Sequence, residues 1–326
     1  MNNIVKKQNR LPREVWVAGI SLKGLWPVET VEKRMKDILE RMENVYAFLP
    51  DIICLPEMIN LSWVEEAEKS KTILSDFAED EISHGPVTGM LAEVARKQNC
   101  YITCPILTKK DGHFYNSSIL LNRQGKTEGV FHKVHPVSTE IIPNSYFKDG
   151  GVTPGQVKPL VYKTDFGNVG MQICFDANWT DSWHALKEGG AELVCFPSQG
   201  PFTYVLRNHA WMNHYAIVSA TGEDAQIIDL TGDMIALDGE FARWVCAPLN
   251  FERVLLHIWP HTLKFKDIQK KYGRKIGIKI YHPENWATLE SLDADIKVRD
   301  ILQEYEIPTY DEQIREATEI QEKYRI

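Results

Sequence analysis

The sequence of 326 residues lacks several features that would assign it to a particular class of protein. Its 37 lysines and arginines are outnumbered by 45 aspartates and glutamates, and no basic stripe is present to neutralise the phosphates of a nucleic acid. No apolar run approaches the roughly 18 residues of a membrane helix, and no signal-peptide core follows the basic N-terminus. We therefore expect a cytoplasmic protein that binds neither nucleic acid nor a membrane.

Cysteine is scarce, and the familiar cofactor motifs are missing. The six cysteines are irregularly spaced in or beside apolar runs, which is typical of free thiols in a reducing compartment. The patterns G-x-S-x-G, G-x-G-x-x-G and H-E-x-x-H do not occur. The histidine pairs lack the cysteine or carboxylate arrangement of a zinc site: His132 with His135, and His209 with His214. The sequence therefore predicts neither a metal nor another cofactor.

Short β-branched runs alternate with amphipathic stretches along the chain, which predicts an α/β protein. Apolar residues recur at three- and four-residue steps where we expect helices, over residues 31–45, 88–98, 181–188 and 202–215. We expect strands over residues 15–20, 51–55, 101–107, 117–121, 128–132, 169–173, 193–196, 216–220, 226–229 and 234–237. Both halves share this order of elements. We predict two similar sheets packed face to face with helices outside, a four-layer αββα sandwich.

A charged segment follows this pattern, so we divide the chain into a domain of residues 1–250 and a C-terminal extension of residues 251–326. The extension contains one strand candidate, residues 253–258, and helical stretches near 294–305 and 310–324. Its aromatic residues lead us to expect that it packs on the main domain or on a neighbouring subunit: Trp259, Tyr281 and Trp286.

Three chemically active side chains follow apolar strands, where α/β sheets place their active sites. Glu57 comes after a hydrophobic run that ends in proline, Lys133 follows the second strand of a hairpin, and Cys174 ends an apolar strand. Each residue could instead have a purely structural role, because cysteines fill cores, glutamates cap strands and lysines keep sheet edges soluble. Together, however, they supply a nucleophile, a base and a cation at equivalent strand ends.

These residues and their surroundings resemble the nitrilase superfamily of carbon-nitrogen hydrolases. The resemblance covers about residues 14–247 and rests on an ordered set of motifs. The motifs are Leu55-Pro56-Glu57, Tyr115-Asn116-Ser117, His132-Lys133-Val134-His135, Gly170-Met171-Gln172-Ile173-Cys174-Phe175-Asp176, Gly189-Gly190-Ala191-Glu192, Phe196-Pro197-Ser198, Arg207 with Trp211, and Ile227-Ile228-Asp229 before Gly232. The family's αββα fold and Glu-Lys-Cys triad are what this resemblance implies.

The resemblance also implies roles for the site residues. Cys174 would attack the carbon of an amide-like C–N bond, and Glu57 would move the protons. Lys133 would stabilise the oxyanion together with the backbone N–H of Phe175. Glu140, seven residues after Lys133, matches a further glutamate that many members keep, and it would orient Lys133 or the substrate. The candidate wall residues of the substrate pocket are Phe175, Trp179, Gln199, Phe202 and Tyr146.

The implied substrate is a small linear amide, and other readings stay open. Nitrilases usually follow the cysteine with Trp-Glu, whereas Phe175-Asp176 resembles the amidase and carbamoylase branches. N-carbamoyl amino acid hydrolases carry an arginine soon after the cysteine, and residues 177–180 contain none. A non-catalytic member that binds a metabolite or a partner protein is the alternative from another class. By resemblance we also expect a homodimer or a higher homo-oligomer.

Overall fold

The computed structural model describes residues 11–25, 30–61 and 73–326. The described residues form two compact units, Trp16–Ala247 and Pro248–Ile326 with residues 11–15. Among the described residues, no helix is both long and apolar enough to cross a membrane. All six cysteines are free thiols, as the sequence predicted.

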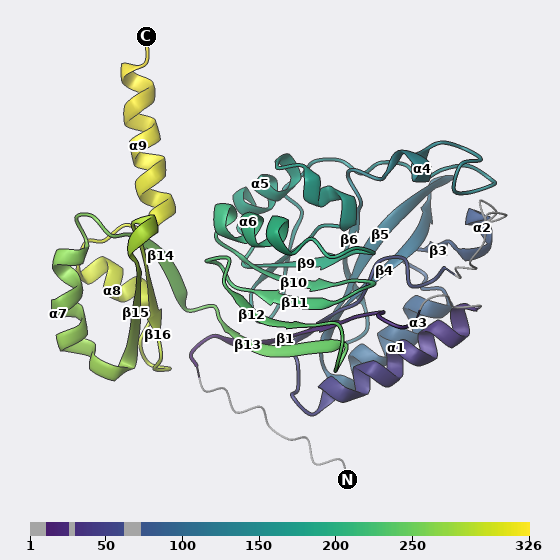
Figure 1. Ribbon diagram of the computed structural model, residues 1–326, viewed down its shortest axis with the longest axis horizontal. Helices are drawn as coiled ribbons and strands as arrows, with labels where there is room; N and C mark the ends of the chain where they lie inside the picture. The colour runs from purple at the N-terminus through teal and green to yellow at the C-terminus, as the bar shows by residue number, and fades with distance from the viewer. Residues whose placement is uncertain (1–10, 26–29, 62–72) are drawn as a thin grey trace. The chain divides into compact units, whose positions relative to one another are not determined.

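The larger unit contains two sheets (Figure 1). The first has the strand order β13-β1-β2-β4-β5-β6, with β3 paired to β4. Its strands are β1 (Glu14–Ile20), β2 (Ile52–Cys54), β3 (Glu79–Asp80), β4 (Tyr101–Lys110), β5 (His113–Leu121), β6 (Thr127–His132) and β13 (Trp244–Asn250). The second has the order β12-β11-β10-β9-β8-β7. Its strands are β7 (Val161–Lys163), β8 (Asn168–Met171), β9 (Leu193–Pro197), β10 (Ala216–Ala220), β11 (Ala225–Ile228) and β12 (Met234–Asp238).

Helices cover the outer face of each sheet (Figure 1). On the first sheet these are α1 (Val31–Tyr46) and α3 (Pro86–Gln98), and on the second α5 (Asp181–Glu188) and α6 (Thr203–Asn213). The short helices α2 (Leu74–Phe77) and α4 (Ser138–Ile141) lie in connections. The predicted αββα sandwich is therefore confirmed.

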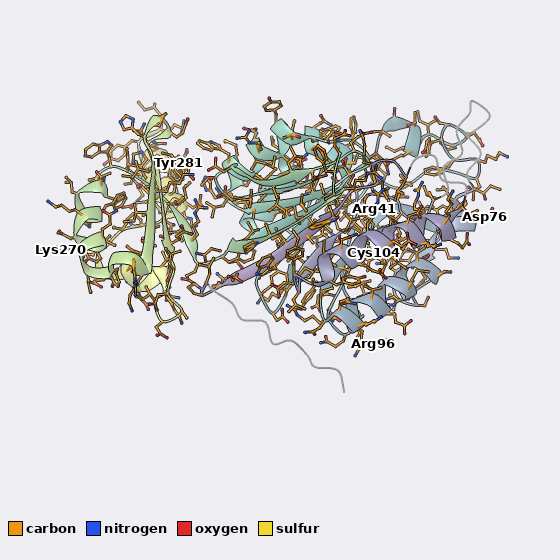
Figure 2. All side chains as sticks on the ribbon, turned by 60° about the horizontal axis from the view of Figure 1, so that its bottom comes forward. Arg41, Asp76, Arg96, Cys104, Lys270 and Tyr281 are labelled. Atoms are coloured by element: carbon orange, nitrogen blue, oxygen red, sulfur yellow. The ribbon has the colours of Figure 1, made fainter. Side chains whose placement is uncertain are left out.

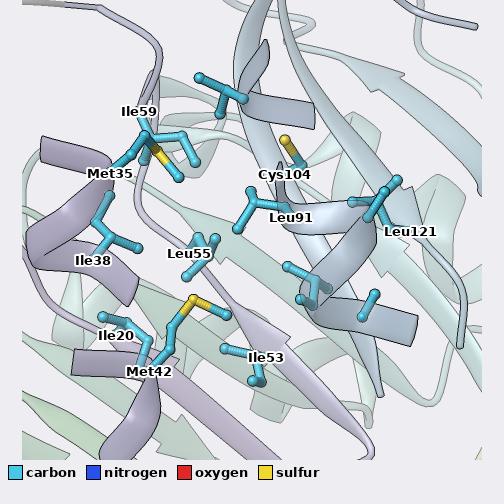
Figure 3. Close-up of a cluster of buried hydrophobic side chains, with 14 of the residues drawn as sticks. Ile20, Met35, Ile38, Met42, Ile53, Leu55, Ile59, Leu91, Cys104 and Leu121 are labelled. Carbon is cyan, nitrogen blue, oxygen red and sulfur yellow. The ribbon is translucent and has the colours of Figure 1, made fainter. Parts of the chain in front are cut away.

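The apolar stripe of α1 explains how a helix layer attaches to its sheet. Thr30 caps the helix by accepting a hydrogen bond from the Lys33 N–H at 3.2 Å. Met35, Ile38 and Met42 are at most 1% exposed and belong to one apolar cluster, in which Met35 lies beside Ile59 and Met42 near Ile53 of β2 (Figure 3). Truncating one such side chain to alanine typically costs about 2–5 kcal/mol, so this stripe fixes the helix more firmly than its cap does.

The two sheets approach each other closely beneath the site described below. Strand β2 lies against β9 and β10 of the second sheet. A methyl group added at Gly19 in β1 would lie 2.7 Å from the backbone oxygen of Ser219 in β10, so a side chain there would force the sheets apart. Charged side chains such as Arg96 are instead exposed on the outer helices (Figure 2).

The second unit has an antiparallel sheet of its own, in the order β14-β16-β15. Its elements are β14 (Arg253–His257), β15 (Ile276–Tyr281), β16 (Trp286–Ser291), α7 (Thr262–Tyr272), α8 (Val298–Glu304) and α9 (Tyr310–Tyr324). Its apolar cluster consists of Leu256, Ile258, Phe265, Ile268, Ile276, Ala287, Leu289, Val298, Ile301 and Ile307. Trp286 is 6% exposed and contacts Tyr310 edge-on within the same unit. Packing of this unit on the main domain or on another subunit stays a prediction.

Several elements escaped the sequence patterns. The sequence patterns do not predict strands β13, β15 and β16 or helix α7. Charged residues interrupt the apolar pattern of β15, β16 and α7, and β13 contains Pro248, which disfavours a strand. The helix expected from residue 294 begins only at Val298. A turn precedes it, in which the Asp293 carboxylate accepts the Asp295 N–H at 3.0 Å, and such local bonding competes with a helix.

Candidate active site

The fold brings the strand ends that carry Glu57, Lys133 and Cys174 to one place. Glu57 lies three residues after the end of β2, Lys133 directly after β6, and Cys174 three residues after β8. Glu57 and Lys133 are each 1% exposed, whereas Cys174 is only half-buried. A buried acid and cation thus lie near a cysteine that is only partly buried.

Lys133 forms the centre of a buried charge cluster. Its Nζ lies 2.8 Å from Glu57 Oε1, and 3.2 Å and 3.1 Å from the two carboxylate oxygens of Glu140. Glu140 belongs to α4 and is 8% exposed. One ammonium group therefore bridges two carboxylates, which are held close together without direct contact between like charges.

These charges shift the protonation of the cluster. Burial favours neutral Lys133, but attraction to Glu57 and Glu140 outweighs it, and the pKa of Lys133 rises above its ordinary value. Burial raises the pKa of Glu140 to about 7, with the nearby Glu57 charge adding to the effect and Lys133 opposing it. The lysine therefore stays charged at neutral pH, while Glu140 titrates in that range.

The thiol lies in a tight turn that follows β8. Cys174 has a φ of 45° and begins the 3-10 helix Cys174–Asn178. A positive φ is uncommon for a side chain with a Cβ and needs support from its surroundings. Asp176 supplies that support, because its buried carboxylate accepts the N–H of Ile173 at 3.0 Å and the N–H of His135 at 2.7 Å. The same carboxylate thereby ties the cysteine turn to the loop after Lys133.

The electrostatic surroundings keep the Cys174 thiol protonated. Burial and the Glu57 charge raise its pKa to about 12, while Lys133 and hydrogen bonds with the Ser198 side chain and the Gln199 backbone oppose this rise. Free thiols ordinarily lose their proton near pH 8.5. A reaction that needs the thiolate must therefore remove the proton by transfer to a nearby base.

An aromatic group extends from the cysteine turn. Trp179 is 38% exposed and stacks on the His135 ring, with centroids 4.2 Å apart and planes inclined by 4°. The Phe175 ring contacts Trp179 edge-on at 5.2 Å. Phe175 and Trp179, both expected at the pocket wall, thus lie together beside Cys174.

The remaining predicted wall residues are spread more widely. Gln199 follows β9, and its Nε2 donates to the backbone oxygen of Glu57 at 2.8 Å. The pKa of Tyr146 is raised by burial and by the charges of Glu140 and Glu57, which places its hydroxyl near the cluster. Phe202 contacts Phe196 edge-on at 5.9 Å and packs with the apolar core under α5 and α6.

Three polar residues without a predicted role also belong to the site. Asn116 contacts Glu57, Asp176 joins two loops, and His135 supports Trp179. The available signal for Asn116 was the run of three polar residues Asn116-Ser117-Ser118 inside strand β5. In the described part of the chain, no group of three or more His, Cys, Asp or Glu side chains could hold a metal ion.

Comparison with known proteins identifies the family. The model of the carbon-nitrogen hydrolase family matches residues 24–254. The chain therefore belongs to the carbon-nitrogen hydrolase family, and the resemblance to the nitrilase superfamily is confirmed. The match includes Glu57, Lys133 and Cys174 and ends near the start of the C-terminal unit.

Two curated relatives illustrate the range of similar proteins. The deaminated glutathione amidase of Synechocystis sp. is 28% identical over 165 residues, which cover 44% of this chain and 60% of that protein. The β-ureidopropionase of Arabidopsis thaliana is 27% identical over 202 residues, which cover 59% of this chain and 47% of that protein. The chain thus matches less than two thirds of the length of either relative.

Solved structures share the fold at low sequence identity. NitFhit of C. elegans has a TM-score of 0.62 and 18% identity, and the match covers 81% of this chain and 66% of that one. Nit3 of Saccharomyces cerevisiae, from the nitrilase superfamily, has a TM-score of 0.59 and 18% identity over 82% and 98%. A mutant amidase of Nesterenkonia has a TM-score of 0.60 and 13% identity over 74% and 92%. These likenesses show the αββα fold.

Proposed function

We propose that this protein hydrolyses the C–N bond of a small linear amide through a thioester on Cys174. The observation that carries the proposal is the buried Glu57–Lys133 pair near a cysteine that is only partly buried. Glu57 acts as the base and acid, Lys133 stabilises the oxyanion, and Glu140 orients Lys133. A metabolite-binding protein without catalysis has no use for an acid and a cation buried next to a thiol.

Acylation begins when Glu57 takes the Cys174 proton as the sulfur attacks the substrate carbonyl carbon. A C–S bond forms, and the carbonyl π electrons move to oxygen. When the tetrahedral intermediate collapses, the C–N bond breaks and Glu57 gives its proton to the departing ammonia or amine. A proton transfer timed with attack fits a thiol whose pKa is raised to about 12.

Deacylation uses the same carboxylate. Glu57 removes a proton from water, the resulting hydroxide attacks the thioester carbon, and the C–S bond breaks. The sulfur regains its proton from Glu57, so the acid product leaves and the enzyme returns to its starting state. One group that changes between base and acid thus serves both steps, and such positioned transfer contributes roughly 10²- to 10⁴-fold.

Lys133 and a backbone N–H stabilise the oxyanion of both intermediates. A cation about 3 Å from the oxyanion is attracted by on the order of 5 kcal/mol at an effective dielectric constant near 20. The Phe175 N–H lies in the first turn of a 3-10 helix, where N–H groups lack intrahelical partners. Loss of one such donor typically costs about 3–4 kcal/mol.

The substrate class is proposed from the site and its relatives. The aromatic pair Phe175 and Trp179 beside the thiol suits an apolar acyl chain, and similar proteins include two amidases. In one Nesterenkonia amidase structure, the acetamide moiety of fluoroacetamide is covalently attached to the active-site cysteine. Similarity to a β-ureidopropionase supports an N-carbamoyl substrate as the second candidate. The free thiols suit a cytoplasmic setting, and we propose a homo-oligomer, to be checked by light scattering.

The test is a panel of amides, N-carbamoyl amino acids and nitriles with ammonia and carbon dioxide as readouts. An amidase converts butyramide to butyrate and ammonia without forming carbon dioxide, whereas a carbamoyl hydrolase releases both ammonia and carbon dioxide from an N-carbamoyl amino acid. Cys174→Ala should abolish turnover, and Cys246→Ala, which removes another half-buried cysteine, should leave it unchanged. Turnover by Cys174→Ala at the wild-type rate would refute the mechanism.

A further inference from the structure

Asn116 is a polar side chain in contact with the Glu57 carboxylate that the mechanism above leaves without a role. It lies in β5, is 1% exposed, and its backbone oxygen accepts the Lys133 N–H at 2.8 Å. Its side-chain Nδ2 donates to Glu57 Oε1 at 2.8 Å and lies 3.5 Å from Glu140 Oε1. One residue of β5 thus contacts all three members of the charge cluster.

The contacts of Glu57 distinguish its two carboxylate oxygens. Oε1 accepts hydrogen bonds from both Lys133 Nζ and Asn116 Nδ2, each at 2.8 Å. Among the described residues, no hydrogen bond is formed to Oε2. Gln199 fixes the backbone of Glu57 from the other sheet by donating to its carbonyl oxygen at 2.8 Å. The carboxylate is therefore held through one oxygen, and the lone pairs of the other remain available.

The side-chain oxygen of Asn116 helps to explain why asparagine occupies this position. Its Oδ1 is buried without a hydrogen-bond partner in the described part of the chain. A buried acceptor without a partner is unfavourable for folding. The Nδ2 contacts with two carboxylates therefore provide the chemical reason for an amide at this position.

We infer that Asn116 is a positioning residue that fixes the rotation of Glu57, so that Oε2 is the oxygen that exchanges protons with Cys174, the leaving amine and water. The inference rests on the proposed hydrolase function. Two donors on Oε1 prevent the carboxylate from turning this oxygen toward the thiol. Asn116 itself touches neither the thiol nor the substrate and acts through Glu57.

The experiment compares Asn116→Ala and Asn116→Asp in the full chain, with butyramide as the probe and ammonia release measured at pH 8. Alanine removes the donor, while aspartate keeps the shape but replaces the donor with a third carboxylate. Ser118→Ala is the matched control, because Ser118 lies two residues further along β5 and is equally buried. Far-UV circular dichroism verifies folding, and Asn116→Ser replaces any alanine variant that does not fold.

We expect kcat to fall roughly 10- to 100-fold in Asn116→Ala and further in Asn116→Asp, with KM changed less than about threefold. Ser118→Ala should keep kcat within about twofold. A space-filling role predicts the opposite order, with aspartate close to wild type, and that order or an unchanged alanine variant overturns the inference. If Cys174→Ala retains turnover, the hydrolase mechanism itself fails. If Cys174→Ala is inactive while Asn116→Ala is unaffected, only the positioning role fails.

Discussion

Replacement of Glu140 by glutamine should change how the stability of the protein depends on pH. Glu140 is buried beside Glu57 and Lys133, and its pKa is raised from 4.5 to about 7. A carboxyl group with a raised pKa in the folded state binds its proton more tightly there than in the unfolded chain. Its contribution to stability is therefore fully present below pH 4.5 and is lost as pH rises through 7.

The magnitude follows from the shift. One pKa unit corresponds to about 1.4 kcal/mol, so the rise from 4.5 to about 7 amounts to about 3 kcal/mol. Glutamine has nearly the same shape and carries no charge at any pH. Relative to Glu140→Gln, the wild-type protein should consequently lose about 2–3 kcal/mol of unfolding free energy between pH 5 and pH 8.

Urea denaturation of both proteins at pH 5, 6, 7 and 8 measures this difference, with circular dichroism as the signal. Glu319→Gln is the control, because Glu319 is exposed on α9, and its difference from wild type should stay flat. A flat difference for Glu140→Gln over the same range would refute the reasoning, because Glu140 would then keep the same charge throughout.

Three further predictions test other parts of the structure. Mass spectrometry after iodoacetamide treatment should find label on half-buried Cys174 and Cys246 before the four buried cysteines. The rate at which Cys174 is labelled should rise about tenfold per pH unit between pH 7 and 9, because its raised pKa keeps the thiol mostly protonated over that range. Early labelling of the buried thiols would contradict this prediction. Gly155→Ala should lower the unfolding free energy by roughly 1–3 kcal/mol in the same urea assay, because the added methyl would lie 2.3 Å from a backbone oxygen of β6. Gly89→Ala in α3 should instead raise the unfolding free energy by about 0.5–1 kcal/mol, because its methyl would meet nothing within 4 Å. Trp286→Ala should lower the unfolding free energy of the C-terminal unit by roughly 3–5 kcal/mol, which faster amide hydrogen exchange in β14 to β16 would reveal. Unchanged exchange in these strands would show that the apolar cluster does not depend on this ring.

The site was predictable to different degrees for different residues. Cys174 and Glu57 each follow an apolar strand, and this local pattern survives in the fold even though β8 ends at Met171. Asn116 gave only a weak signal, since it begins a run of three polar residues in β5, and such a run does not identify the partner of any one of them. Glu57, its partner, is 59 residues away in the chain, and no local periodicity relates the two.

Local patterns in the chain were enough to predict the αββα class, the approximate limits of most helices and strands, and the family, because apolar periodicity and ordered motifs are local properties. The separate core of Pro248–Ile326 became evident from the folded chain, because charged residues obscure the strand pattern there. The bridging of Glu57 and Glu140 by Lys133 was likewise visible only once the chain was folded. Distances and burial arise from packing between segments far apart in the chain, and these two quantities set the charge and the proton affinity of each group.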